Sequence, residues 1–416
     1  MMTDNKTQLE PPKTTQNGDI EEKQTSLYSA PLFTFSTSKN IICEYGAASR
    51  LGEILLEYKI KSALLVTDEG IKQLGLYHSA MQSLAQENIK VTVFSEVQAD
   101  PVENIVLSAV EVAKFAGVDA IIGFGGGSSM DVAKIVSLLA HPQNDQALAD
   151  IYGVGNAHGK RLKLIQIPTT AGTGSEVTQV AIVTTGKTTK AGIVTPLFLP
   201  DLAILDAQLT MGLPAHVTAA TGIDAMVHAI EAYTSKLKKN PMSDMFAKEA
   251  LRLMSSHIQN AVHTGNDRLA REAMLLGSML AGQAFANSPV AAVHALAYPL
   301  GGHFHIAHGL SNSLVLPHVM RFNLDGAAEY YAELAPIIFP QLELTGNARK
   351  IGELLINELE VLIKNLGLPT SLKEMGIPEI SLPKLAEDAM LQTRLLVNNP
   401  RELVFEDALA IYKAAF

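Results

Sequence analysis

The fold is decided by residues 118–134, which read VDAIIGFGGGSSMDVAK. A short apolar run is followed by three glycines and then by the amphipathic start of a helix, a pattern that predicts a buried strand, a tight turn and a helix. Glycines let a pyrophosphate approach the backbone, and the first N–H groups of a helix carry the positive end of its dipole. The segment therefore indicates a nucleotide site. The alternative is an ordinary strand-to-helix turn, and the spacing departs from the usual G-x-G-x-x-G fingerprint.

A second polar loop supports the nucleotide interpretation. Residues 162–178 read LKLIQIPTTAGTGSEVT, a strand-like run that ends at Pro168 and continues into hydroxyl side chains and glycines. Such groups can donate hydrogen bonds to phosphate or ribose oxygens. They could also simply cap the next helix. Two such loops after two strands favour the nucleotide site.

A candidate metal site lies in the second half of the chain. Asp224 and His228 stand four residues apart in TGIDAMVHAIEAY, so on a helix both side chains share one face. A carboxylate oxygen and an imidazole nitrogen at this spacing can bind one cation. His294 and His308 follow downstream, beside glycines and a proline. A lone histidine is more often a satisfied core or surface residue, but the four residues together indicate a metal site.

Composition limits the class of protein. A chain of 416 residues is too long for one ordinary core, so we expect two domains. A net charge of −10 and a pI near 5.7 argue against a nucleic-acid partner. No run of about 18 apolar residues predicts a membrane span, and the N-terminus lacks the apolar region of a signal peptide. The single cysteine, Cys43, fits a reducing cytoplasm and leaves only N and O ligands for a metal.

The chain divides into three parts by its pattern. Residues 1–28 are polar and predict a disordered tail. Residues 29–213 alternate between strand-like and helical runs and predict an α/β domain with a mostly parallel sheet, whose ligands bind beyond the carboxyl ends of the strands. Residues 214–416 are dominated by helical stretches and predict an all-helical domain that contains the candidate metal ligands. The clearest strands are expected at 61–70, 89–97, 120–127 and 164–170, and clear helices at 104–117, 241–264 and 267–286.

Four segments carry a family resemblance: GGGSSMDVAK, PTTAGTGSEVT, GIDAMVHAIEAY and VHALAYPLGGHFHIAHG. In this order they resemble the iron-containing, group III alcohol dehydrogenases over nearly the whole chain after the tail. The resemblance implies a nucleotide-binding α/β domain, a helical metal-binding domain, and a cleft between them where NAD(P) meets a divalent metal. It also implies a small alcohol or aldehyde as substrate and a homo-oligomer, with a dimer expected.

The resemblance assigns roles to particular residues. It implies a metal held by Asp224, His228, His294 and His308, a pyrophosphate held by Gly126, Gly127 and Ser128, further cofactor contacts from Thr169, Thr170, Thr173 and Gly174, and a lysine near the cofactor at Lys190.

The chemistry of the donor set agrees with this assignment. A cation bound by one Asp and three His keeps open coordination positions, and it makes an alcohol easier to deprotonate because it stabilises alkoxide. The predicted function is metal-dependent hydride transfer between a primary or small secondary alcohol, or its aldehyde or ketone, and NAD. The donors accept Fe(II) or Zn(II), and zinc binds more tightly by affinity order. The resemblance alone favours iron.

Tyr298, Asp100 and Asp68 each have more than one possible role. Tyr298 stands where many relatives have a histidine that relays the alcohol proton, and a phenol with a pKa of about 10 is a poorer relay near neutral pH. We take Tyr298 as the candidate catalytic residue, with pocket shaping as its alternative; His303 and His305 could replace the relay or be exposed loop residues. Asp100 stands where relatives often have Asn and could still accept a hydrogen bond from ribose. Asp68 ends the strand ALLVTD, where a carboxylate favours NAD over NADP, unless it only caps the next helix.

Two other classes of protein share some of these features. A lyase resembling dehydroquinate synthase would also combine NAD with a metal, but it would need basic residues for a phosphorylated acid, and AVHALAYPLGG is apolar. A non-enzymatic NAD-binding or assembly protein has no use for four ligands. A dehydrogenase is the favoured prediction.

Overall fold

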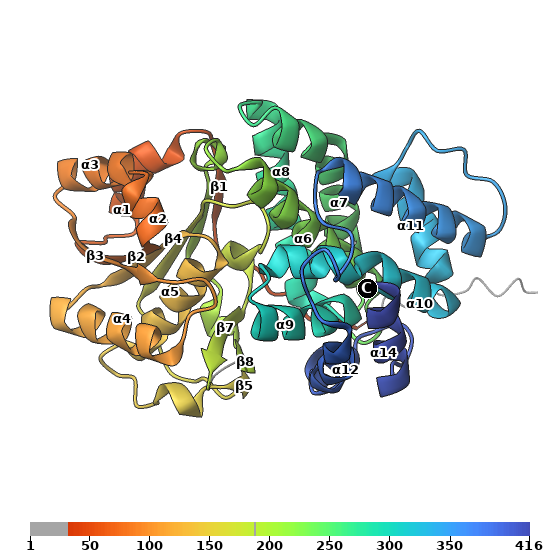
Figure 1. Ribbon diagram of the computed structural model, residues 1–416. Coiled ribbons are helices and arrows are strands. Elements are labelled where there is room, and N and C mark those ends of the chain that lie inside the picture. Colours follow the sequence, from red (N-terminus) through yellow and green to blue (C-terminus); the bar gives the residue numbers. More distant parts are fainter. Residues whose placement is uncertain (1–31, 187–188) are drawn as a thin grey trace, which may run out of the picture. The chain divides into compact units, whose positions relative to one another are not determined.

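A six-stranded parallel sheet organises the first half of the chain (Figure 1). The computed structural model describes residues 32–186 and 189–416, so the tail predicted at 1–28 lies outside the described residues. The strands lie in the order β1-β9-β6-β4-β2-β3, and each described pairing is parallel. They are β1 (Ile41–Cys43), β2 (Ser62–Asp68), β3 (Lys90–Val97), β4 (Ala120–Gly125), β6 (Lys163–Pro168) and β9 (Leu202–Leu205). The mostly parallel α/β architecture is confirmed.

Apolar runs explain why this sheet is covered on both faces. Each residue of β4, AIIGFG, is buried, as are five of the seven residues of β2. Strands buried on both sides need a helical layer on each face. One layer is formed by α1 (Leu51–Glu57), α2 (Glu69–Gln73) and α3 (His78–Gln86). The other is formed by α4 (Glu103–Ala116) and α5 (Gly127–Leu139).

The strand order reverses beside β2. The chain runs from β2 to its neighbour β3, crosses back to β4 on the other side of β2, and then continues outward to β6. In open parallel sheets ligands bind at the carboxyl ends of the strands where the order reverses. Here those ends carry Asp68 on β2 and the glycines that follow β4.

A second, three-stranded sheet was not expected from the sequence. It contains β5 (Gly153–Val154), β7 (Val180–Thr185) and β8 (Thr189–Val194), with β7 and β8 antiparallel. The short edge strand β1 and the buried strand β9 were also not expected. Strands β7 and β8 follow the second polar loop in the chain, whereas β5 precedes it.

Helices form the second half of the chain, and no described residue after Leu205 lies in a strand. They are α6 (Ala215–Thr234), α7 (Pro241–His263), α8 (Arg268–Asn287), α9 (Ala292–Phe304), α10 (His308–Ile338), α11 (Ala348–Asn365), α12 (Leu382–Met390), α13 (Thr393–Leu396) and α14 (Phe405–Ala414). Helix α6 packs against α7, α8 and α10, and each of its residues from Gly222 to Thr234 is buried. It is therefore the central helix of this half.

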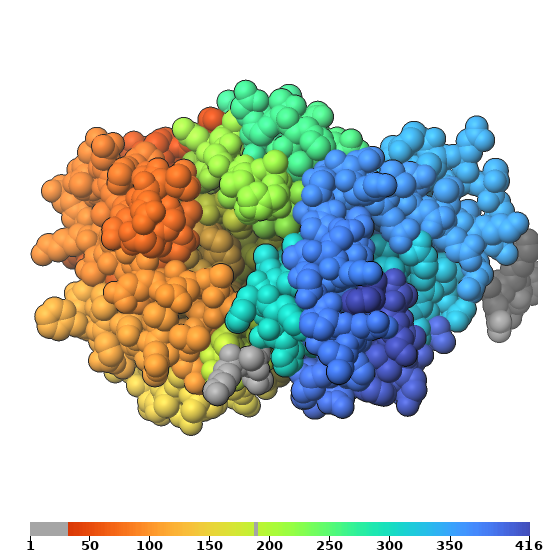
Figure 2. All heavy atoms as spheres, viewed as in Figure 1, coloured from red at the N-terminus to blue at the C-terminus, as the bar shows by residue number. Residues whose placement is uncertain are grey.

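The two halves are in direct contact. The space-filling view shows the first half, orange to yellow, lying against the helices of the second half, green to blue (Figure 2). Residues 33–416 form one compact unit, and the division into domains at 213/214 stays a prediction. None of the described helices is long and apolar enough to span a membrane.

Candidate metal centre and cofactor cleft

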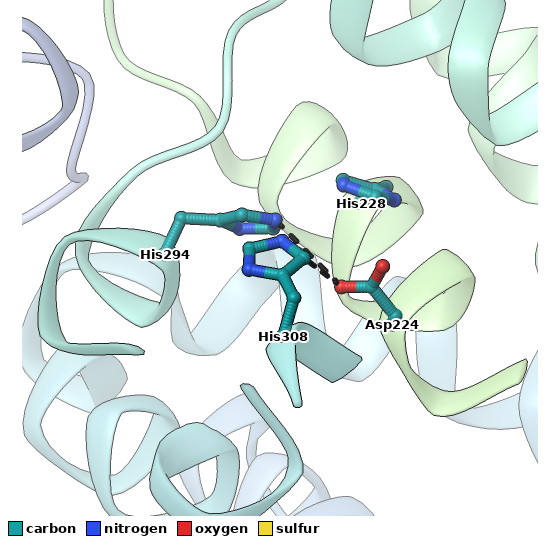
Figure 3. Close-up of side chains that lie close together, drawn as sticks. All are labelled: Asp224, His228, His294 and His308. Atoms are coloured by element: carbon teal, nitrogen blue, oxygen red, sulfur yellow. Dashed lines mark ion pairs between the residues drawn. The ribbon is translucent and has the colours of Figure 1, made fainter. Parts of the chain in front are cut away.

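Four side chains from three helices converge on one point (Figure 3). Asp224 and His228 come from α6, His294 from α9, and His308 is the first residue of α10. One donor atom of each lies within 4.8 Å of the others. His294 Nε2 is 3.9 Å and His308 Nε2 is 3.6 Å from Asp224 Oδ1. The structure thus brings together the four residues suggested as metal ligands, and one carboxylate with three imidazoles is a donor set that suits a divalent cation.

The second polar loop orients His228. The Nδ1 atom of His228 is 3.2 Å from the carbonyl oxygen of Gly172, which can only accept, so Nδ1 carries the proton and Nε2 is free for a cation. The imidazole ring also stacks between Phe285, at 4.3 Å between centroids, and His294, at 4.7 Å. The loop that was expected to bind the cofactor therefore also supports the metal site.

Glu231 orients His294 in the same way. The Nδ1 atom of His294 is 2.6 Å from Glu231 Oε2, and the backbone N–H of Val293 donates to Glu231 Oε1 at 2.7 Å. Glu231 is buried on α6, one turn beyond His228. A carboxylate behind a ligand imidazole fixes its tautomer and increases its basicity. Sequence reasoning missed this residue, although it continues the helix face of Asp224 and His228.

Asn312 is a further residue of this cluster that the sequence analysis missed. It lies on α10, and its Nδ2 donates to Asp224 Oδ1 at 2.6 Å. The same Nδ2 is 3.3 Å from Nε2 of both His294 and His308. The Asn312 side chain thus reaches three of the four residues at their donor atoms.

Burial controls the protonation of the cluster. Desolvation raises the pKa of Asp224 to about 6, against the opposing effect of His294. Desolvation, followed by repulsion from His294, holds the pKa of His228 and His308 well below the ordinary value for histidine. The imidazoles of His228 and His308 are therefore neutral at pH 7, which is the form that binds a metal.

The two polar loops meet at the start of α5. A Cβ atom on Gly127 would lie 2.8 Å from Thr173 Cγ2, so only glycine lets the loops approach this closely. Gly126 precedes the helix as its N-cap, and a Cβ there would face Thr170 Oγ1 at 3.8 Å. The open helix N-terminus and the threonine hydroxyls thus share one edge of the sheet, as expected for a phosphate site.

One cavity connects these loops with the group of four candidate metal ligands. Its volume is about 400 Å³. The lining includes Gly127, Ser128 and Thr173 from the loops and His228, His294 and His308 from the cluster, and also contains Asp100, Lys190 and Tyr298. Apolar side chains and a guanidinium complete the wall near the cluster: Phe285, Val290, Leu395, Val397 and Arg394.

A buried lysine fixes the second polar loop. Lys134 on α5 is fully buried, and its Nζ donates to Ser175 Oγ at 2.7 Å, to Thr178 Oγ1 at 3.0 Å and to the carbonyl of Val180 at 2.7 Å. Asp131, one turn earlier, accepts from Ser175 Oγ at 2.6 Å. Burial lowers the pKa of Lys134, and the charge of Asp131 opposes this shift. Asp131 and Lys134 therefore hold the second polar loop against α5.

Some residues predicted to bind the cofactor lie outside the lining of the cavity: Asp68, Gly126, Thr169, Thr170 and Gly174. Asp68 Oδ1 accepts from the backbone N–H of Ile71 at 3.0 Å, so it caps α2, as its alternative interpretation required. It nevertheless lies at the strand reversal, 3.4 Å from a Cβ built on Gly125. Gly174, with φ of +59°, packs against Gly282 of α8, where a Cβ would lie 2.5 Å from Gly282 Cα. Its position is explained by packing.

At the rim, Asp100 and Lys190 contact each other. Lys190 Nζ is 2.5 Å from Asp100 Oδ1 and 5.8 Å from the ring centroid of Tyr298. The Tyr298 ring in turn lies 5.9 Å from that of His308. Burial raises the pKa of Tyr298, and the Arg394 guanidinium opposes this effect. Tyr298 is therefore a neutral phenol beside the candidate metal ligands.

The two histidines considered as replacement relays lie elsewhere. His303 Nε2 is 2.6 Å from Asp388 Oδ2, and His305 is an exposed residue that ends α9. Neither belongs to the described lining of the cavity.

Family models match both halves of the chain. Residues 38–207 match the iron-containing alcohol dehydrogenase model, and residues 218–416 match the C-terminal model of the Fe-containing alcohol dehydrogenase family. The chain belongs to the iron-containing alcohol dehydrogenase family. The resemblance noted in the sequence is confirmed.

Relatives of this dehydrogenase cover nearly its whole length. It is 41% identical to long-chain-alcohol dehydrogenase 1 of Geobacillus thermodenitrificans, over 89% of this chain and 94% of that protein. It is 35% identical to the NAD-dependent methanol dehydrogenase of Bacillus methanolicus, over 89% of this chain and 96% of that protein. Among solved structures, 1,3-propanediol oxidoreductase matches with a TM-score of 0.88 and 34% identity, over 93% of this chain and all of that one.

Sulfoacetaldehyde reductase from Bifidobacterium kashiwanohense, solved in complex with NAD+, matches with a TM-score of 0.81 and 29% identity, over 93% of this chain and 99% of that one. The family assignment makes the chain an oxidoreductase of the alcohol dehydrogenase class. It favours this class over the lyase and the non-enzymatic alternatives.

Proposed function

We propose that this dehydrogenase transfers a hydride between a primary or small secondary alcohol, or its aldehyde or ketone, and NAD, at a divalent cation held by Asp224, His228, His294 and His308. The observation that carries the proposal is the single cavity that is lined both by the helix start at Gly127 and Ser128 and by three of the four ligand candidates. A nicotinamide cofactor anchored at the loops would reach the substrate at the cation without leaving this cavity.

The cation supplies Lewis-acid chemistry when bound, which favours alkoxide over alcohol and polarises a carbonyl in the reverse direction. The four residues fit it because two imidazoles are held neutral by burial and two are oriented by partners, Glu231 behind His294 and Gly172 behind His228. The family description supports iron, and the donor set is also compatible with zinc.

The cofactor is placed by the backbone of the first helix turn. We propose that Gly126, Gly127 and Ser128 bind the pyrophosphate and that Thr170 and Thr173 donate from the opposite loop, while Thr169 and Gly174 shape that loop. NAD use is in keeping with the relatives named above. Asp68 faces the strand reversal with one carboxylate oxygen engaged by Ile71, so its negative charge would disfavour a 2′-phosphate.

The charged side chains of Asp100 and Lys190, at the rim of the cavity, would lie beside the central part of the bound cofactor. Lys190 is paired with Asp100, which leaves this part of the cleft without a net charge. We propose that Lys190 approaches the cofactor and that Asp100 accepts from ribose hydroxyls.

Tyr298 is proposed as the residue that contacts the substrate oxygen. Its raised pKa keeps the phenol protonated, so it donates a hydrogen bond and does not relay the proton as a base. The apolar wall of Phe285, Val290 and Leu395 excludes water and accommodates an alkyl chain.

We also propose a cytoplasmic location and a homodimer. A cytoplasmic location is supported by Cys43, which is exposed and free of any disulfide. A homodimer is supported by the apolar residues that α4 exposes, among them Phe115 with 97% of its surface accessible. Light scattering after gel filtration would test the dimer.

The proposed function is tested with anaerobically purified protein. We expect about one equivalent of iron or zinc per chain and NAD reduction with small primary alcohols, lost after chelation and restored by the metal. His294→Ala should lose tight metal binding and turnover together, because three ligands hold a cation weakly. His263→Ala is the control, since His263 is exposed at the end of α7. Equal metal loss in both variants, or turnover without metal, would contradict the proposal.

A further inference from the structure

Two large apolar side chains are exposed at the mouth of the cavity. Leu237 and Val397 belong to the cavity lining, yet 59% and 53% of their surfaces are accessible. A single exposed apolar residue is common on a protein surface and has no special meaning. Here, however, two of them border the opening of the proposed active site, where a bound substrate would cover them.

Hydrogen bonds hold the segments that carry these residues side by side. Leu237 lies between α6 and α7, and Val397 follows α13. The backbone N–H of Lys236 donates to the carbonyl oxygen of Asn398 at 2.8 Å, so the neighbours of Leu237 and Val397 are in direct contact. The buried side chain of Asn398 also donates from Nδ2 to the carbonyl oxygen of Val290 at 3.1 Å, which joins the segment before α9 to the other two. The three segments therefore form one continuous wall.

This wall continues inward to the candidate metal ligands. Val290 and Leu395 line the same cavity and are buried. Phe285 lines it as well, and its ring stacks on the imidazole of His228 at 4.3 Å between centroids. Apolar side chains thus line the cavity from a metal ligand to the mouth. We call these five residues the apolar track: Phe285, Val290, Leu395, Val397 and Leu237.

The charged side chains of the lining do not compete with this track. Lys190 is paired with Asp100 at 2.5 Å, and the guanidinium of Arg394 interacts with the phenol of Tyr298. Lys238 is exposed and can keep its ammonium group in water. An alkyl chain could therefore lie along the track without removing these charged groups from their partners or from water.

We propose that the apolar track binds the alkyl chain of a long-chain primary alcohol or aldehyde, with the substrate oxygen at the cation and the far end of the chain against Leu237 and Val397. This inference rests on the proposed function, since it takes the four candidate ligands as the place of the substrate oxygen. It adds the substrate class, because a track that opens at the surface does not limit the chain to a few carbons. The competing role for Leu237 and Val397 is a contact between two copies of this chain.

The first experiment measures kcat/KM with NAD for straight-chain primary alcohols from ethanol to decanol, each below its solubility limit. Each CH2 group that leaves water for the track should raise kcat/KM by up to about fourfold, so the rise should continue beyond hexanol. A maximum at hexanol or at any shorter alcohol would overturn the proposal. If no alcohol is oxidised, the proposed function fails; if ethanol is oxidised but longer alcohols are not better substrates, only the role of the track fails.

Polar substitutions at the mouth test the two exposed residues. Leu237→Ser and Val397→Ser should each lower the ratio of kcat/KM for decanol to kcat/KM for ethanol by about 10-fold, because only the longer chain reaches these positions. Leu391→Ser is the matched control, since Leu391 is 72% exposed just before α13 but lies outside the described lining of the cavity. A parent-like ratio in both test variants, or an equal fall in the control, would overturn the proposal.

Light scattering after gel filtration on the same variants addresses the competing role. A substrate track predicts that Leu237→Ser and Val397→Ser keep the molar mass of the parent while the ratio falls. A lower molar mass together with an unchanged ratio would assign these two residues to a contact between copies of the chain, and the proposal would fail.

Discussion

Replacing Glu231 by Gln should weaken the metal site without unfolding the protein. The carboxylate makes two hydrogen bonds, one from His294 Nδ1 at 2.6 Å and one from the backbone N–H of Val293 at 2.7 Å. Gln keeps a carbonyl oxygen for Val293 but turns an NH2 group toward His294. That contact needs Nδ1 as an acceptor, so the proton moves to Nε2, the nitrogen that binds the cation.

The size of the effect follows from these two bonds. Partners behind a ligand are worth about 10- to 100-fold in metal affinity, or about 1.4–2.7 kcal/mol. Glu231→Gln should lose this amount and keep a near-normal unfolding temperature. Glu231→Ala should lose it and also destabilise the metal-free protein by about 1–3 kcal/mol, because the buried N–H of Val293 then has no acceptor.

The assay is chelator competition for Zn(II) combined with thermal unfolding of the metal-free protein. Glu333→Gln is the matched control, since Glu333 also accepts a hydrogen bond, from Tyr233, but lies outside the ligand cluster. The reasoning fails if Glu231→Gln binds Zn(II) as tightly as the parent, or if the control loses as much affinity.

Three further predictions concern cofactor choice, the hydrogen bond to the substrate oxygen, and pH. Asp68→Ser should raise kcat/KM with NADP relative to NAD, since serine still caps α2 but carries no charge against a 2′-phosphate; an unchanged ratio would leave Asp68 as a cap alone. Tyr298→Phe should lower kcat by roughly 10²-fold with normal metal content, because the hydrogen bond from the phenol to the substrate oxygen is lost, and Tyr298→His should restore part of the rate because an imidazole N–H can also donate; a Phe variant with parent kinetics would reduce Tyr298 to a pocket wall. Asp224 has a pKa of about 6 in the cation-free protein and must be ionised to bind, so protons compete below that pH and the cation dissociation constant should rise about tenfold per pH unit there; titrations that show no rise between pH 6 and 5 would contradict the raised pKa of Asp224.

The parts of the fold that the sequence predicted were those with strong local patterns. The apolar run before the glycines predicted β4 and the start of α5. The long periodic segments predicted α7 and α8 with boundaries that agree within one residue at each end. The parts that were missed have weak local patterns. β1 is three residues long and partly exposed, and β7 alternates buried and half-exposed residues within a segment that follows a loop.

The same distinction applies to the site. The i, i+4 spacing of Asp224 and His228 identified their helix face, His294 and His308 were added from their setting beside glycines and a proline, and the family resemblance then assigned all four as ligands. Glu231 and Asn312 were missed because their partners are distant in sequence: Glu231 contacts a residue 63 positions away, and Asn312 one 88 positions away. Both nevertheless extend a helix face that already carries a ligand, so a search along those faces would have found them.

The contact between Gly174 and Gly282 has a consequence for engineering this enzyme. The cofactor loop touches α8 backbone to backbone, with a Cβ on either residue falling 2.5–2.8 Å from the other chain segment. If this loop is replaced by the corresponding loop of a relative, the new loop has a shape that fits the α8 helix of that relative. The exchangeable module is therefore the loop together with α8, although the two are separated by about a hundred residues, and a graft of the loop alone should fold poorly wherever the recipient carries a side chain at the second glycine.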